Sequence, residues 1–161
     1  MRRFSIRTLM AFILVSATGL AALKNANSPW VGMMLLVALA AVGIAVMGAV
    51  IMRGRERSWW AGFAFFCSGY LYFAIGPEFS EKFQLDLGTT DLLQEIHSRM
   101  ALELPGKTIE EQQAAALAWS RNWGTFQIVG HSLFALLAGL AGGSVASWFY
   151  ARRERAESAA G

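Results

Sequence analysis

The 161 residues of this chain are 55% hydrophobic and only 16% charged, which leaves too few polar side chains to cover an ordinary soluble domain. The net charge of +3 does not indicate nucleic-acid binding, because the basic residues lie at the ends of apolar runs rather than on one solvated face. The single cysteine, Cys67, excludes an internal disulfide and fits no zinc or haem-attachment spacing. We therefore expect a membrane protein without a cofactor.

Four stretches are long enough, or nearly so, to cross a hydrocarbon core of about 30 Å, which takes about 20 helical residues. They cover approximately residues 4–23, 30–52, 59–76 and 125–150. Pro77 ends the third stretch because proline cannot continue a helix. The expected fold is all-α: a single integral membrane domain, built as a four-helix bundle, with short amphipathic helices in the outer loop 77–124 between spans three and four.

The first stretch also has features of a cleaved signal peptide. It combines a basic start, an apolar centre and the small residues Gly19 and Ala21 at a suitable processing site. Cleavage would leave three spans with unchanged orientation. The length of the apolar run and the immediate return through "KNANSP" favour an uncleaved hairpin.

Charge placement predicts the orientation, because short cytoplasmic segments are rich in lysine and arginine. Arginines gather before the first span, between the second and third, and after the fourth, whereas segment 77–124 has a net negative charge. Tryptophans lie at both ends of the apolar runs and near mid-depth of none, as expected for the membrane boundary. We expect a multi-pass protein of the bacterial inner membrane with both termini cytoplasmic and its basic segments on anionic lipid.

The outer segment contains two predicted helices. "TTDLLQEIHSRMALEL" is typical of an amphipathic helix capped by Asp91, with an ion pair between Glu95 and Arg99 on its wet side. Its apolar stripe comprises Leu92, Leu93, Ile96, Met100 and Leu104. Thr108 and Glu111 form a capping box for the second helix. Gly124 either hinges that helix against the fourth span or lies inside one continuous helix.

His131 is predicted near the outer boundary of the fourth span, with Gln127 one turn further out. One interpretation is a ligand site or proton relay that faces the bundle. The other, which the pattern favours, is an anchor that hydrogen-bonds to Gln127 or water. His97 could join His131 around a metal or haem, but two histidines without helix-turn spacing or nearby carboxylates do not favour such a site.

Small residues recur every four positions on two of the spans. On the fourth span they are Ala135, Gly139, Gly143 and Ser147, and on the second they are Ala41, Ala45 and Ala49. Such faces let another helix backbone come close. We expect them to be helix-packing sites, with the two faces against each other, against a second copy or against another membrane protein.

The third span carries Cys67, Ser68, Tyr70 and Tyr72 but no aspartate, glutamate or lysine. Proton pumps, ion-coupled carriers and intramembrane proteases usually need buried ionisable groups. The sequence therefore favours a non-enzymatic structural or accessory component. Two alternatives stay open: a small oligomeric transporter or channel with a polar path past Ser68, Tyr70 and Tyr72, and an enzyme acting on lipid headgroups at the outer boundary through His131.

Three sequence stretches resemble a known family. "RRFSIRTLM" at the start, and "VGHSLFALLAGLAGG" with "WFYARRE" near the end, resemble uncharacterised small bacterial membrane proteins of the planctomycete type. The resemblance covers the four spans better than the outer segment. It implies an inner-membrane location and transfers no activity and no site residues.

Overall fold

The computed structural model describes residues 17, 19–25, 28–75, 88–102 and 108–160. These residues are helical nearly throughout and include no strand, so the predicted all-α class is confirmed. Most of the predicted first span lies outside the described residues, as do residues 76–87 and 103–107 of the outer segment.

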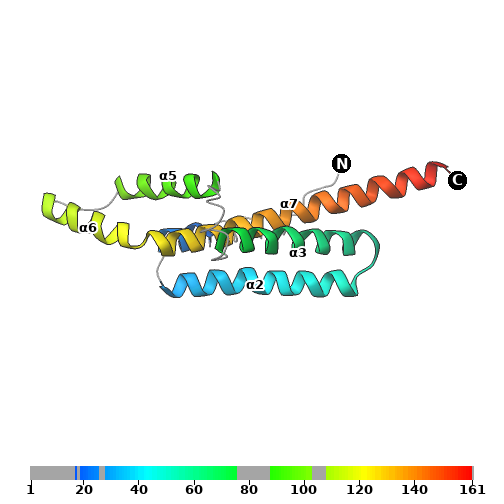
Figure 1. The fold of residues 1–161 in the computed structure, drawn as a ribbon, viewed down its shortest axis with the longest axis horizontal. Helices are drawn as coiled ribbons and strands as arrows, with labels where there is room; N and C mark the ends of the chain where they lie inside the picture. Colours follow the sequence, from blue (N-terminus) through cyan, green and yellow to red (C-terminus); the bar gives the residue numbers. More distant parts are fainter. Residues whose placement is uncertain (1–16, 18, 26–27, 76–87, 103–107, 161) are drawn as a thin grey trace.

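Three long helices lie side by side. Helices α2 (Ser28–Ile51) and α7 (Trp123–Ala160) run in the same direction, and α3 (Gly54–Ile75) is antiparallel to both (Figure 1). Helices α5 (Gly88–Leu102) and α6 (Ile109–Arg121) lie at one end of this bundle. Helix α6 extends beyond it, whereas α5 lies alongside the beginning of α7.

The helix ends follow local chemistry. Pro29 stands at the start of α2, where its missing N–H costs nothing. A two-residue connection, Met52 and Arg53, separates α2 from α3, and Gly54 supports the tight reversal with a φ of 60°, a backbone region that favours glycine. Helix α7 continues ten residues beyond its predicted end at 150, through the polar segment that ends the chain.

The break between α6 and α7 lies at Asn122 rather than at Gly124, which is inside α7. The carbonyl oxygen of Asn122 accepts hydrogen bonds from the Phe126 N–H at 3.0 Å and from the Thr125 hydroxyl at 2.7 Å. Asn122 therefore supplies the first carbonyl of α7.

The small-residue face of α7 packs against α3 of the same chain. A Cβ added at Gly143 would lie 2.8 Å from the Trp59 carbonyl oxygen, and one at Gly139 would lie 2.9 Å from Cys67 Cβ. Gly62 of α3 makes a similar close approach from the other side, because a Cβ there would lie 2.6 Å from the Gly142 carbonyl oxygen of α7. Backbones this close depend on the absence of side chains.

Two further residues of that face are also covered. Ala135 is completely buried in a cluster with residues of α2 and α3, and Ser147 is buried with its hydroxyl donating to the Ser144 carbonyl oxygen at 3.0 Å. The Ser58 hydroxyl of α3 donates to the Ala146 carbonyl oxygen of α7 at 2.9 Å, which joins the start of α3 to the C-terminal half of α7.

The small-residue face of α2 also packs toward α3. Ala45 is completely buried in the cluster that contains Phe63, and Ala41 packs against that cluster while Ala49 is half-buried. A Cβ at Gly48 would overlap the ring of Trp60 in α3. Aromatic side chains of α3 contact both small-residue faces, and Ala45 of α2 and Ala135 of α7 belong to the same buried cluster, so the packing of both faces takes place within this chain.

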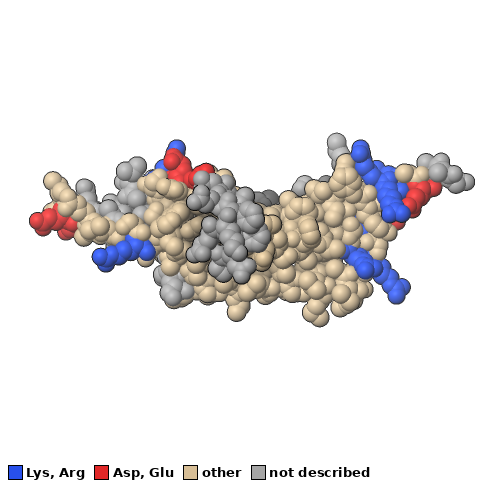
Figure 2. Space-filling model, in the orientation of Figure 1, with Lys and Arg blue, Asp and Glu red and all other residues tan. Residues whose placement is uncertain are grey.

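Much of the bundle surface is apolar. Two helices, α2 and α7, are long and apolar enough to cross a membrane. Only 17% of the most apolar stretch of α2 is buried within the protein. Its residues Ile44 and Met47 are 60% and 63% exposed. Figure 2 shows that the coloured charged side chains on the visible face lie toward the two ends of the molecule, and that the described surface between them is uncharged.

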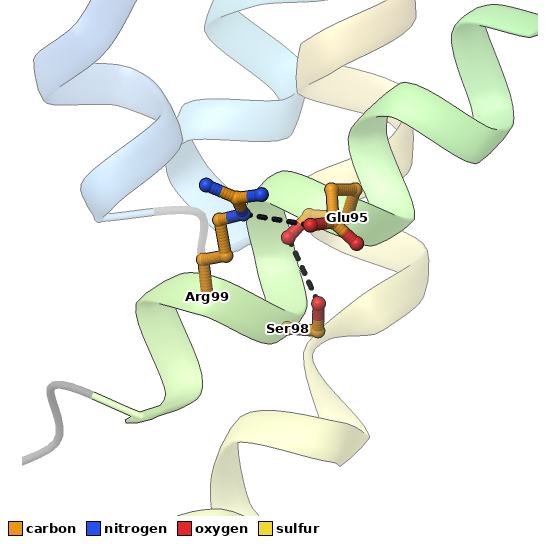
Figure 3. A network of polar contacts seen from close by, with 3 residues as sticks. All are labelled: Glu95, Ser98 and Arg99. Carbon is orange, nitrogen blue, oxygen red and sulfur yellow. Dashed lines mark hydrogen bonds and ion pairs between the residues drawn. The ribbon is translucent and has the colours of Figure 1, made fainter.

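Helix α5 packs through one stripe on α7. Leu93 is almost completely buried against Gly130, where any side chain would overlap it, whereas Leu92 is 48% exposed and so lies outside the stripe. On the exposed side, Arg99 Nε donates to Glu95 Oε1 at 2.7 Å and the Ser98 hydroxyl donates to the Glu95 carbonyl oxygen at 2.8 Å (Figure 3). The predicted ion pair is confirmed.

The two outer helices begin differently. Helix α5 starts at Gly88, three residues before the predicted cap, so Asp91 lies within its first turn. For α6 the predicted capping box is confirmed: the Glu111 N–H donates to the Thr108 hydroxyl, and the Thr108 N–H donates to the Glu111 carboxylate, both at 3.2 Å.

Candidate functional site

A cluster of four polar side chains lies where α3, α5 and α7 meet. The Tyr70 hydroxyl of α3 donates to Thr89 Oγ1 of α5 at 2.8 Å and lies 3.0 Å from His131 Nδ1 of α7. On the other side of the imidazole, Nε2 lies 3.4 Å from Thr90 Oγ1. We call Tyr70, Thr89, Thr90 and His131 the polar cluster. It joins three helices that are far apart in the sequence.

The local sequence explains how the cluster forms. Thr89 and Thr90 lie in the first turn of α5, on the side that Leu93 anchors against α7. Gly130 gives Leu93 room to lie close, which brings the start of α5 onto the adjacent His131. The Tyr70 ring lies 6.5 Å from the Phe134 ring, one turn along α7, so aromatic packing holds the phenol beside the imidazole.

His131 is only 2% exposed, so its hydrogen bonds decide whether its burial is tolerated. With the Tyr70 proton directed at Thr89, His131 Nδ1–H donates to the phenol oxygen and Nε2 accepts from Thr90. In the reverse order, Tyr70 donates to Nδ1, Nε2–H donates to Thr90, and the Thr89 hydroxyl donates to the phenol oxygen in place of accepting from it. Either arrangement satisfies a neutral imidazole, and neither contains a carboxylate to stabilise a charged one.

One side of the polar cluster is apolar. Tyr70 packs against the core cluster that contains Cys67, Leu71 and Ala135. Ser132, beside His131, is completely buried and donates to the Ile128 carbonyl oxygen of its own helix at 2.8 Å. The hydrogen-bonded chain therefore ends at the apolar core and connects the three helices to one another.

Gln127 and His97 lie outside the polar cluster. Gln127 is half-buried, and His131 bonds to Tyr70 and Thr90 instead. The His97 ring packs edge-on against Trp123 and Phe126 at centroid distances of 5.2 and 4.9 Å, separate from the polar cluster. Within the described part of the chain, no group of three or more histidine, cysteine, aspartate or glutamate side chains could hold a metal.

The polar residues of α3 do not share one path. Tyr70 faces α5 and α7, whereas Ser68 and Tyr72 line a groove of about 360 Å³ between α2 and α3. The remaining lining residues are apolar: Leu35, Leu39, Val42, Leu71 and Ile75. The Ser68 hydroxyl donates to the Ala64 carbonyl oxygen at 2.6 Å and so is satisfied within its own helix. Tyr70 thus lies on a different side of α3 from Ser68 and Tyr72, and within one chain the three residues do not line a common polar path.

Sequence reasoning identified His131 but missed its partners. Tyr70 could have been suspected, because a tyrosine in a charge-free span needs a partner for its hydroxyl. Nothing in the sequence around Thr89 and Thr90 indicated a contact with His131, apart from their position just before the predicted helix cap at Asp91. Comparison of the chain with protein-family models, with curated proteins and with solved structures gave no match.

Proposed function

We propose that this chain is a multi-pass inner-membrane protein of four spans with a structural or accessory role, in which the bundle presents the α5–α6 pair at the outer surface of the membrane. The exposed apolar surface of α2 is the observation that carries the proposal. Leu36, Ile44, Met47 and Val50 are 60–77% exposed on this helix. Each such side chain favours an apolar environment by about 1.5–3 kcal/mol, which lipid supplies and water does not.

Helix α3 crosses with its neighbours under this proposal. From Ser58 to Ile75 it has 18 uncharged residues, about 27 Å of helix, close to the thickness of the hydrocarbon core. Its tryptophans, tyrosines and serines lower its mean hydropathy without adding charge. Because the α2–α3 connection is only two residues long, a membrane-crossing α2 requires α3 to return through the same membrane.

The first span has support from its described end. Residues 19–24 are helical, and Ala22 is completely buried in a cluster with Met34 of α2 and Val129 of α7. A Cβ at Gly19 would lie 3.0 Å from Leu133. These contacts fit a hairpin that returns directly into α2, and they favour retention of the first span over cleavage.

The proposed accessory role rests on how the bundle positions helices α5 and α6. The polar cluster and the Leu93–Gly130 contact fix α5 on the bundle, while α6 extends away and exposes Ile109 and Leu117 by 75% and 62%. The small-residue face of α7 already packs on α3, so that face is occupied within the chain. The exposed side chains of α6 are therefore the surface that we assign to a partner membrane protein or a second copy.

Two experiments test the proposal. A reporter enzyme that is active only outside the cytoplasm is fused after Asp91, with a matched fusion after Arg53 as control; we expect activity for the first and none for the second. A photo-crosslinking residue is then placed at Leu117 or, as a lipid-facing control, at Ile44. The accessory role predicts protein adducts at Leu117 and lipid adducts at Ile44; equal absence of protein adducts at both positions contradicts it.

A further inference from the structure

One face of α7 is exposed along the half of the helix nearest its C-terminal end, opposite the face that packs on α3. Helical spacing places Leu137, Ala141, Val145, Trp148, Arg152 and Arg155 on this face, and we call it the α7 lane. Leu137, Val145 and Trp148 are 55%, 49% and 48% exposed. The lane is apolar at one end and basic at the other.

The basic end of the lane has a defined geometry. The Arg152 guanidinium lies 4.3 Å from the centre of the Trp148 ring, so the indole holds it over the helix surface. Arg155 follows one turn later on the same side. In contrast, Arg153 points to the other side of the helix, where its Nε donates to the Glu157 carboxylate at 2.8 Å. Among the described residues, Arg152 and Arg155 have no such ion pair.

The lengths along the lane match one leaflet. Trp148 and Leu137 are 11 residues apart, about 16 Å of helix, which is close to half of the hydrocarbon core. Ala141 has a short side chain in the middle of this interval and leaves a shallow surface between the larger residues. The two arginines lie beyond Trp148, at the depth expected for headgroups.

We infer that the α7 lane binds one anionic phospholipid, with its phosphate on Arg152 and Arg155 and an acyl chain along Trp148, Val145 and Leu137. This inference rests on the proposed membrane insertion. Guanidinium groups pair with phosphate oxygens in a two-pronged geometry, and the stacked position of Arg152 reduces the entropy lost on binding. A free phosphate would use the arginines but gain nothing from the apolar part, so the occupant is a lipid.

The test compares two variants with equal charge loss at the same end of the bundle. Arg152→Gln/Arg155→Gln removes the basic end of the lane, and Arg53→Gln/Arg55→Gln removes two exposed arginines, one in the α2–α3 connection and one in the first turn of α3. The full-length protein is extracted into mixed micelles with equal amounts of phosphatidylglycerol and phosphatidylcholine. Native mass spectrometry then measures the ratio of the two lipids retained on each protein.

Near a membrane surface each arginine strengthens anionic-lipid binding about fivefold wherever it lies, so both double variants should lose up to roughly 25-fold in phosphatidylglycerol preference. The lane variant should lose more than the control, because it also loses the two-pronged contacts between guanidinium groups and phosphate. Arg152→Lys should fall between the wild type and the lane variant, because lysine keeps the charge but loses the planar contact. Equal losses in the two double variants, or no preference in the wild type, would overturn the inference.

Membrane insertion is measured separately, in vesicles. A cysteine at Ile44 that is protected from a water-soluble maleimide in vesicles shows that the bundle is inserted. Protection at Ile44 without phosphatidylglycerol preference therefore refutes the lipid site alone. Reaction at Ile44 refutes the proposed insertion together with the lipid site that depends on it.

Discussion

Replacing Gly62 by alanine adds one methyl group at the closest described approach between the backbones of α3 and α7. The new Cβ would lie 2.6 Å from the Gly142 carbonyl oxygen and 2.7 Å from Ala146 Cβ. Both neighbours belong to α7 and neither is the end of a flexible side chain. To reach an ordinary contact of 3.4 Å, the helices would have to separate locally by about 0.8 Å.

The loss in free energy of unfolding caused by that separation can be estimated. Overpacking a well-packed contact typically costs about 1–3 kcal/mol. Alanine also favours the helix over glycine by about 1 kcal/mol, which partly conceals the cost. Gly69→Ala in the same helix is the matched control, because its Cβ would have nothing within 4 Å. The helix preference then cancels between the two variants, and their difference gives the packing cost.

The assay is reversible unfolding in mixed micelles, with the free energy of unfolding obtained from the denaturing-detergent midpoint of each variant. We expect Gly62→Ala to be less stable than Gly69→Ala by about 1–3 kcal/mol. The helical circular dichroism signal of both should match the wild type before unfolding. Equal stability of the two variants would refute the close contact between α3 and α7.

Three further predictions concern side-chain contacts. Tyr70→Phe removes the hydroxyl shared by Thr89 and His131, so hydrogen exchange of α5 amides should accelerate by the equivalent of about 1–3 kcal/mol while α2 is unchanged; unaltered exchange in α5 contradicts the polar cluster. Ser58→Ala should lower the free energy of unfolding by about 1 kcal/mol through loss of the bond to Ala146, whereas Ser68→Ala, whose bonds stay within its own helix, should change it less. Arg99→Gln should change stability by less than about 0.5 kcal/mol, because both members of its ion pair are more than half exposed; a larger loss would show that the pair does more than the structure indicates.

The sequence predicted features that depend on neighbours along the chain. The charge-free runs locate α2, α3 and most of α7, because helix length and apolar composition are local properties. The Thr108–Glu111 capping box and the Glu95–Arg99 pair were also predictable, since spacing along a helix determines both. Each of these contacts involves residues three or four positions apart.

Contacts between distant residues were harder to predict. A repeat of small residues on α7 identifies a packing face but not its partner, which is α3 because Trp59, Phe63 and Cys67 fill that face. His131 was singled out, yet its partner Tyr70 is 61 residues away and no spacing rule joins them. The helical position of Thr89 in α5 was also missed, and its hydroxyl bonds to Tyr70 of another helix, a contact that local spacing does not reveal.

The central claim, that the exposed apolar face of α2 lies in lipid, is tested most directly by cysteine labelling at Ile44. Cys67 is completely buried and is replaced by alanine, and single cysteines are then introduced at Ile44 or, as a water-exposed control, at Glu95. Native vesicles, opened so that both faces are accessible, are treated with a water-soluble maleimide. We expect rapid labelling at Glu95 and protection at Ile44 that disappears on denaturation; equally rapid labelling at both positions before denaturation would contradict the account.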